Sequence, residues 1–235
     1  MERAWLLALA VAHLLGLGAS QVAAAPAAAD VRAGERLATS ATPARAACAS
    51  CHGQRGEGTA NFPRLAGVGT AYLRSQLEAF ASGARKNPIM QPIAQALSPE
   101  QRSQVAAYFS SRPATGASPD RTARAPSDTG AWLATRGRWE DAVPACAQCH
   151  GPGGVGVGED FPPLAGQPAA YLAEQLRAWQ SGSRHPGPLG LMETIARKLS
   201  AADIQAVSDY YAGLSGAAAG AAAAPGGART GRATP

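Results

Sequence analysis

The sequence contains the stretch Cys48-Ala49-Ser50-Cys51-His52, and the same pattern returns as Cys146-Ala147-Gln148-Cys149-His150. Two cysteines separated by two residues can form thioether bonds with the two vinyl groups of one haem, and the adjoining histidine can bind the haem iron. The chain has 4 cysteines. Because all of them lie in these two stretches, none remains for a disulfide or for another metal. The pattern therefore predicts two haem c groups per chain, both covalently attached.

Two other uses of a Cys-x-x-Cys pair have to be weighed against haem attachment. One pair alone could be a redox-active dithiol, and two pairs could supply four thiolates to a structural zinc ion. Neither use explains why a histidine directly follows each pair, or why Gly53 and Gly151 come next. The duplicated five-residue motif favours haem over both alternatives.

Length and composition favour a helical chain with two small domains. The 235 residues include 27 glycines and only 6% aromatic residues, and the alternation of Val and Ile that would indicate long strands is almost absent. Each half would hold under about 90 residues, a size at which a hydrophobic core alone is marginal and a bound cofactor often stabilises the fold. We therefore expect an all-α fold in which each domain wraps around one covalent haem.

The N-terminal residues 1–29 have the features of an export signal. A short basic start is followed by the apolar run 4–18 and then by small residues, with cleavage expected between residues 24 and 29. The run is about 15 residues long and contains His13, whereas a membrane-spanning helix needs ~20 apolar residues. Because haem attachment to exported chains takes place outside the cytoplasm, we predict a periplasmic protein with at most a peripheral membrane association.

The sequence is an internal duplication. Aligning the two haem motifs matches Phe62-Pro63-Arg64-Leu65-Ala66-Gly67 with Phe161-Pro162-Pro163-Leu164-Ala165-Gly166. Polar and aromatic residues further along also match, and these pairs are Tyr72 with Tyr171, Gln76 with Gln175, and Arg85 with Arg184. Each half is therefore expected to have the same fold.

The repeat and the composition between its copies predict the domain boundaries. We expect one domain at 30–112 and a second at 130–215. Between them, residues 113–129 are rich in Pro, Ser, Thr and Ala, which indicates a linker of moderate stiffness. Residues 216–235 consist mostly of Ala, Gly and Pro, and such a composition has too little apolar side-chain surface to fold. We expect this last segment to be a disordered tail.

Apolar spacing predicts two helices after the haem motif in each half. Over residues 73–80, apolar side chains recur at i, i+4 and i+7, and Gly83 follows as a stop signal. The last helix of the first half is expected to start at Ser98, with Gln101 three residues later, as in a capping box. The second half repeats these features at Leu172, Leu176, Trp179, Gly182, Ser200 and Asp203.

A haem iron with a histidine on one side has one further axial position. Apart from the initiator, the only methionines are Met90 and Met192, and they occupy equivalent places in Pro/Gly-rich segments of the two halves. A lone methionine is usually core filler, but the coincidence of position favours thioether ligation of both irons. His185 could compete in the second half, but it aligns with Lys86, so we expect it to be a surface residue.

Pro63 and Pro162 lie at matching positions after the two haem motifs. A proline has no N–H group to donate, but its carbonyl is free to accept a hydrogen bond. Metal-bound histidines generally donate their second ring N–H to such an acceptor. Each proline carbonyl could therefore orient the histidine of its own half, or each proline could be a simple turn residue.

The formal charge of +5 does not indicate nucleic-acid binding, because no basic run and no basic–aromatic interleaving occurs in the sequence. The charge is uneven, however. Residues 30–112 hold ten basic and five acidic residues, a net +5, whereas 113–215 hold eight basic and ten acidic residues, a net −2. We therefore predict that the first domain is steered toward an acidic partner. The residues expected to act are Arg45, Arg55, Arg74, Arg85 and Lys86.

The sequence is similar to dihaem class I cytochromes c of the cytochrome c4 type, over about residues 30–215. The similarity rests on the export signal, the duplicated haem motif, the paired Phe-Pro-x-Leu-Ala-Gly segments and the paired methionines. The resemblance implies two all-α cytochrome c domains that face one another, with haem propionates near their interface. It also implies that His52, Met90, His150 and Met192 are the axial ligands.

The resemblance implies a periplasmic carrier of single electrons, without a substrate of its own, that moves them from respiratory donor proteins to a terminal oxidase or reductase. A fixed electron-transfer subunit of a dehydrogenase complex is an alternative. A catalytic dihaem enzyme, such as a peroxidase or a thiosulfate dehydrogenase, would need an open or replaceable sixth position. Two methionine-capped irons argue against that alternative.

Overall fold

The computed structural model describes residues 27–114, 128–185 and 187–214, and within these ranges the chain forms helices and isolated β-bridges only. The expected all-α fold is confirmed. The export signal up to residue 26, the linker from 115 to 127 and the tail from 216 lie outside the described residues. No helix in the described part of the chain is long and apolar enough to cross a membrane.

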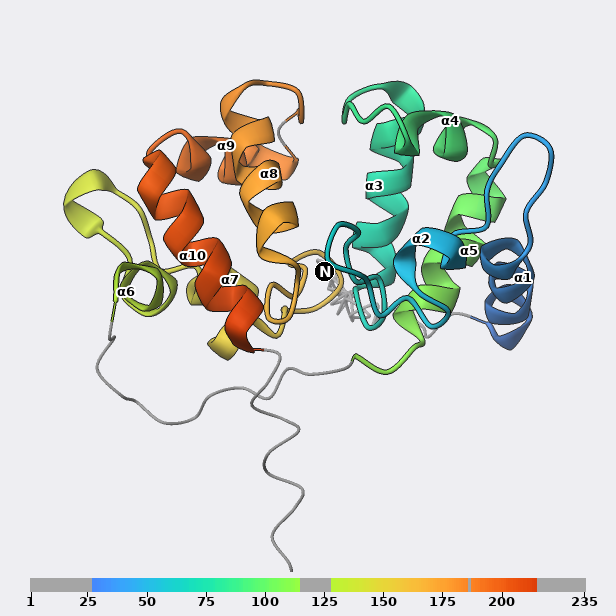
Figure 1. Cartoon of the computed structure of the whole chain (residues 1–235), viewed down its shortest axis with the longest axis horizontal. Helices are drawn as coiled ribbons and strands as arrows, with labels where there is room; N and C mark the ends of the chain where they lie inside the picture. Colours follow the sequence, from blue (N-terminus) through green and yellow to red (C-terminus); the bar gives the residue numbers. More distant parts are fainter. Residues whose placement is uncertain (1–26, 115–127, 186, 215–235) are drawn as a thin grey trace, which may run out of the picture.

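Two groups of helices lie side by side, with α3 and α8 toward the centre of the molecule (Figure 1). The first group consists of α1 (Ala28–Thr39), α2 (Ala49–His52), α3 (Thr70–Ser82), α4 (Met90–Gln95) and α5 (Pro99–Ser110). The second group consists of α6 (Thr129–Thr135), η1 (Trp139–Asp141), α7 (Ala147–His150), η2 (Pro152–Gly154), α8 (Ala169–Gln180), η3 (Pro188–Gly190), α9 (Leu191–Ala196) and α10 (Ala201–Gly213).

The predicted helix ends agree with the structure to within a few residues. Ser98 and Ser200 each cap the last helix of their group in a complete capping box. Gly83 ends α3 in the left-handed conformation, whereas α8 ends at Gln180, two residues before Gly182. The short helices α2, α4, α7 and α9 were not predicted, because segments of four to six residues are too short to show a helical period.

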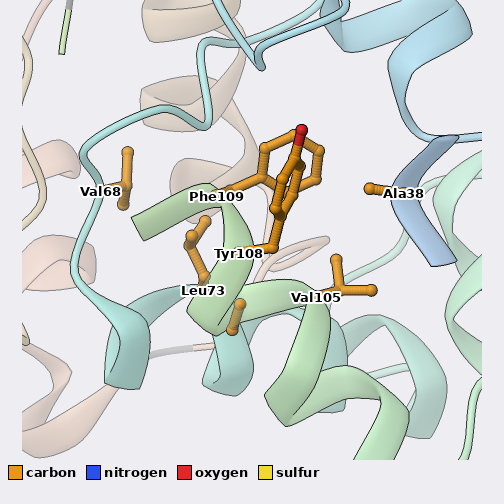
Figure 2. Packing of buried hydrophobic residues seen from close by; sticks show 7 residues of the cluster. Ala38, Val68, Leu73, Val105, Tyr108 and Phe109 are labelled. Carbon is orange, nitrogen blue, oxygen red and sulfur yellow. The ribbon is translucent and has the colours of Figure 1, made fainter. Parts of the chain in front are cut away.

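The core of each group forms where its last helix packs against the first. In the first group, α5 contributes Val105, Tyr108 and Phe109, which pack with Ala38 of α1 and Leu73 of α3 (Figure 2). In the second group, α10 packs against α6 and α8 through a matching cluster. The buried members of that cluster are Ala134, Leu172, Val207 and Tyr211.

One glycine in each group sets how closely the first and last helices approach. A Cβ atom at Gly34 would lie 2.0 Å from the backbone oxygen of Gln104, and a Cβ atom at Gly130 would lie 2.2 Å from that of Ala206. Any larger residue would push the two helices apart. The repeat therefore preserves a specific backbone contact between the first and last helices of each group.

Candidate haem-binding sites

Each haem motif forms one turn of helix. The His52 N–H donates to the carbonyl of Cys48 over 3.0 Å, and the His150 N–H donates to that of Cys146 over 2.9 Å. One helical turn brings the first cysteine and the histidine of a motif onto the same side of the segment. All four cysteines are free thiols and only partly buried, so each can form a thioether bond.

The two histidines are held in one orientation by the predicted proline carbonyls. The Nδ1 atom of His52 lies 2.9 Å from the oxygen of Pro63, and that of His150 lies 2.8 Å from the oxygen of Pro162. Because a carbonyl can only accept, each Nδ1 carries the hydrogen and each Nε2 keeps its lone pair for a metal. The predicted role of both carbonyls is confirmed.

The histidines also have the protonation state that a metal ligand requires. Burial lowers the pKa of both His52 and His150, while the bond to the proline carbonyl acts weakly in the opposite direction. A buried imidazole with a lowered pKa is neutral at pH 7. The edges of Phe62 and Phe161 approach the two imidazole rings at centroid distances of 6.0 and 6.3 Å, which further restricts ring rotation.

The loop after each motif reverses at a glycine that no other residue could replace. Gly56 has φ +76° and lies under the ring of Phe109, and Gly154 has φ +69° and lies under the ring of Tyr211. A Cβ atom at either position would meet that ring at 2.5 Å. The loop therefore passes directly over the core, and this path brings the proline carbonyl to the histidine.

Met90 and Met192 occur near the start of α4 and α9, the short helices that follow α3 and α8. They were expected in irregular segments, and the structure places them in the first turn of a helix instead. The Asn87 side chain accepts hydrogen bonds from the N–H groups of Ile89 and Met90 and so fixes the start of α4. Ligation of either iron by these methionines stays a prediction.

The donor set of each half fits one covalent haem. Two unpaired thiols, an oriented neutral imidazole and a partly buried thioether at the same repeat position are the groups that a c-type haem requires. No group of three or more His, Cys, Asp or Glu suited to another metal occurs among the described residues.

Comparisons with known proteins identify the family of the chain. Residues 31–113 match the cytochrome c family, and residues 133–210 match the family described as cytochrome c oxidase, cbb3-type, subunit III. A cytochrome c4 from Pseudomonas aeruginosa is 38% identical over 209 residues, 88% of this chain and 98% of that protein. The chain belongs to the dihaem cytochromes c of the cytochrome c4 type. It is a carrier of electrons with two covalently bound haem c groups.

Two further proteins are similar to this cytochrome. A protein named thiosulfate dehydrogenase electron acceptor, from Stutzerimonas stutzeri, is 51% identical over 176 residues, 74% of this chain and 82% of that protein. The crystal structure of reduced cytochrome c4 from Pseudomonas stutzeri superposes with a TM-score of 0.67 at 36% identity and covers 78% of this chain and 98% of that one.

The two domains of this cytochrome meet through an exchange of hydrogen bonds around two buried arginines. Arg85 donates to Gln76 of its own domain and to Tyr171 and Gln175 of the other. Arg184 in turn donates to Gln175 of its own domain and to Tyr72 and Gln76 of the first domain. The backbone repeats the exchange, because Lys86 N–H donates to Ser183 and His185 N–H to Ala84.

Burial of two arginines, Arg85 at this interface and Arg45 within its own domain, corrects part of the expected docking surface. Arg85 is only 7% exposed and Arg45 only 6%, so neither can meet an acidic partner. Arg55, Arg74 and Lys86 are exposed as predicted. The sequence already carried a signal for the interface, because the polar pairs Tyr–Tyr, Gln–Gln and Arg–Arg match between the copies. We had assigned no function to the Tyr and Gln pairs and had placed Arg85 on the docking surface. His185 is exposed, as expected.

A third contact between the domains has no counterpart in the repeat. The backbone N–H and carbonyl of Arg64 bond to the side-chain amide of Gln167, at 3.0 and 2.9 Å. The Arg64 guanidinium donates to Ala66 of its own domain and to Ala165 of the other. Pro163 and Val68 stand at the equivalent positions, so this contact forms on one side only.

Proposed function

We propose that this cytochrome accepts single electrons from a thiosulfate dehydrogenase in the periplasm and passes them to a further redox protein. The observation that carries the proposal is the 51% identity, over 82% of its length, to a protein named thiosulfate dehydrogenase electron acceptor. The haem groups supply the one-electron chemistry through their iron. The chain's residues attach the groups, orient the two histidines and hold the two domains together.

The proposal includes the axial ligands and the domain boundaries predicted above. His52 and Met90 would bind one iron, and His150 and Met192 the other, in domains 30–112 and 130–215. Two irons with both axial positions filled suit electron transfer and leave no open site for a substrate. This supports a carrier that is not itself an enzyme.

The test mixes the oxidised full-length protein with thiosulfate and a catalytic amount of purified thiosulfate dehydrogenase. Both haems should become reduced, as followed by haem absorbance. Without the dehydrogenase they should stay oxidised, because the carrier has no thiosulfate chemistry of its own. Reduction by thiosulfate alone would favour the enzymatic alternative, and no reduction in the complete mixture would contradict the proposed donor.

A second candidate is the general respiratory shuttle between donor proteins and a terminal oxidase, which the similarity to cytochrome c4 along 98% of that relative favours. The same experiment with a quinol-oxidising complex as the donor separates the two. Faster reduction by that complex than by thiosulfate dehydrogenase would favour the shuttle. Recovery of the native protein from the periplasmic fraction, with its N-terminus between residues 24 and 30, would test export.

A further inference from the structure

The two haem motifs are approached by loops that differ at one buried position. A β-bridge pairs Thr42 with Arg45 in the first half and Arg138 with Val143 in the second. Arg45 and Val143 each lie three residues before the first cysteine of their motif. The first domain therefore has a cation where the second domain has an apolar side chain, and Val143 is 1% exposed.

The Arg45 guanidinium lies beside the attachment point of its haem. Its Nη1 atom is 3.9 Å from the Sγ atom of Cys48 and 3.0 Å from the carbonyl oxygen of Ala46, and its Nη2 atom is 3.1 Å from that of Ser40. At the equivalent place the Cys146 thiol lies 3.6 Å from the carbonyl oxygen of Leu133 and beside the uncharged hydroxyl group of Tyr211, with no cation at this position. No carboxylate pairs with Arg45 in the described part of the chain, and carbonyl dipoles orient the charge without neutralising it.

The other charges near the motifs do not cancel this difference. In the first domain, Glu57 accepts the backbone N–H of Arg55, and both side chains are exposed, so water screens them. In the second domain, Arg138 is paired with Asp141 and Asp203. Exposed or paired charges act weakly at a distance, whereas a buried unpaired charge acts through a low-dielectric medium.

The other buried arginines lie at the interface and contact both domains. Arg64 donates to Ala66 and Ala165, which are equivalent residues of the two copies, so its charge lies between the domains. Arg85 and Arg184 occupy equivalent positions in the two copies, and each donates to the equivalent glutamine of the other domain. Among the buried arginines of the described residues, Arg45 is thus the one that belongs to a single haem site.

We propose that Arg45 raises the reduction potential of the haem attached at Cys48 above that of the haem attached at Cys146. Reduction adds a negative charge to the iron, and a buried, unpaired cation beside the thioether stabilises the reduced form. In the one-electron-reduced protein, the electron is therefore found mainly on the haem of the first domain. The inference rests on the two attached haems and not on the identity of the electron donor.

The test is a spectroelectrochemical titration of the full-length protein with both haems attached. Each potential is assigned to its domain by nuclear Overhauser contacts between haem protons and neighbouring side chains in the half-reduced state. In the wild-type protein, the haem at Cys48 should be reduced first. If the haem at Cys146 is reduced first, the proposal is overturned, whether or not any variant folds.

Substitutions separate the buried charge from other effects. Arg45→Gln keeps donors for the carbonyls of Ala46 and Ser40, and it should lower the preference of the electron for the first haem about tenfold, which corresponds to about 59 mV for one electron. Arg45→Lys keeps the charge and should leave most of the difference. Arg36→Gln removes an exposed charge of the same domain and should change little.

Arg64→Gln provides the internal comparison, because it should lower both potentials and leave the difference between them unchanged. Equal shifts of both potentials in Arg45→Gln, or no shift at all, would overturn the proposal. A failure of thiosulfate dehydrogenase to reduce the protein would leave these potentials measurable. The two proposals therefore fail separately.

Discussion

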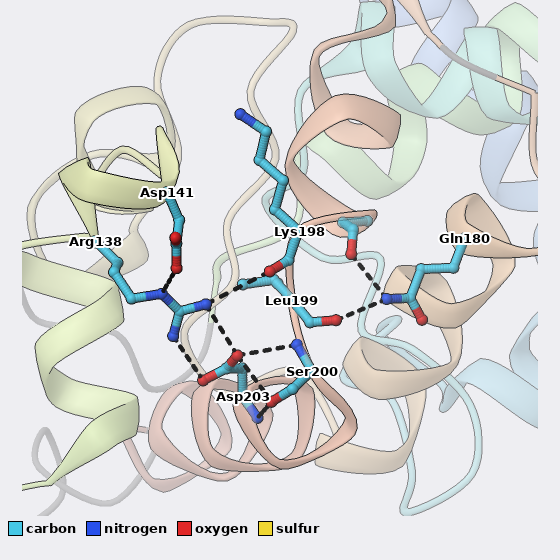
Figure 3. A network of polar contacts seen from close by, with 8 residues as sticks. Arg138, Asp141, Gln180, Lys198, Leu199, Ser200 and Asp203 are labelled. Carbon is cyan, nitrogen blue, oxygen red and sulfur yellow. Dashed lines mark hydrogen bonds and ion pairs between the residues drawn. The ribbon is translucent and has the colours of Figure 1, made fainter.

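Arginines near the first haem motif and near the second have different kinds of partner. Arg45 and Arg64 are buried and donate to carbonyl groups. Arg138 is partly exposed and donates to both carboxylate oxygens of Asp203 and to Asp141 (Figure 3). A duplicated scaffold has thus kept its helix contacts and its histidine orientation while the charge around each site changed. The contacts that both domains share stabilise the fold, whereas the arginine contacts that differ set the distribution of charge around each haem site.

The largest effect should come from breaking a contact that both domains share. Gly34→Ala and Gly130→Ala should each destabilise their own domain by about 2–3 kcal/mol, because the new methyl group meets a backbone oxygen that cannot move aside. Alanine normally stabilises a helix relative to glycine, so the sign is reversed here. Thermal unfolding followed by circular dichroism measures the change.

Gly213→Ala is the matched control for these variants, because Gly213 lies in α10 and nothing lies within 4 Å of the added Cβ atom. It should be neutral or slightly stabilising. If Gly34→Ala were tolerated as well as Gly213→Ala, the close approach of α1 and α5 would not be a requirement of the fold.

The next largest effect should come from a contact that forms on one side of the interface only. Gln167→Val introduces the residue that stands at the equivalent position of the first copy, Val68. It leaves the backbone N–H and carbonyl of Arg64 without partners in a buried interface, at a cost of about 1–3 kcal/mol. Because this cost falls on the association of the domains, chemical denaturation should change from one transition toward two.

An exposed glutamine serves as the control for Gln167→Val. Gln205 lies on α10 and bonds only to Asp209, so Gln205→Val should leave the denaturation curve unchanged. A single, unshifted transition in Gln167→Val would show that the domains are held together without this contact.

The repeat and the haem motifs made most of the sites predictable, because their residues are marked by spacing within a few positions. The histidine, its proline carbonyl and the helix caps of each half follow from local chemistry of that kind. Arg85 was assigned wrongly because its partners, Tyr171 and Gln175, come from the other copy, and sequence spacing does not show how two domains meet. Arg45 was assigned wrongly for another reason: its partners are local, but a buried arginine and an exposed one look alike in a sequence.

A smaller effect should distinguish the caps of the two last helices. Arg138 donates to Asp203 and lowers the pKa of that carboxyl group, and the bonds from Ser200 add to the effect. A lowered folded-state pKa gives stability that is present above the unfolded-state value of ~3.9 and is lost as the pH falls through the folded-state value. In the first domain the equivalent residue is Gln101, which does not titrate.

Asp203→Gln would therefore make the second domain resemble the first. At pH 6 it should lower the melting temperature of the second domain by a few degrees, and the difference from the wild-type protein should shrink below about pH 4. Asp209→Asn, an exposed substitution on the same helix, is the control. A difference that is constant with pH would mean that the Asp203 charge adds nothing to the cap.

The smallest effect should come from the exposed charges. The net charge differs between the domains, because residues 30–112 carry +5 and residues 113–215 carry −2. Haem propionates add negative charge to both domains and leave this difference in place. With Arg45 and Arg85 buried, steering toward an acidic partner depends on Arg55, Arg74 and Lys86. Electron exchange with such a partner should slow as added salt shortens the Debye length to ~10 Å, because the rate of encounter depends on long-range attraction.

Charge reversal tests which domain the acidic partner approaches. Arg74→Glu with Lys86→Glu should slow the exchange severalfold at low salt. Arg177→Glu with Arg197→Glu, at exposed positions of the second domain, should slow it much less, although both pairs change the total charge equally. Stopped-flow mixing at several salt concentrations measures the rates. Because the same total charge is removed in both, equal slowing would mean that the partner responds to net charge alone, and the first domain would then have no preferred role in docking.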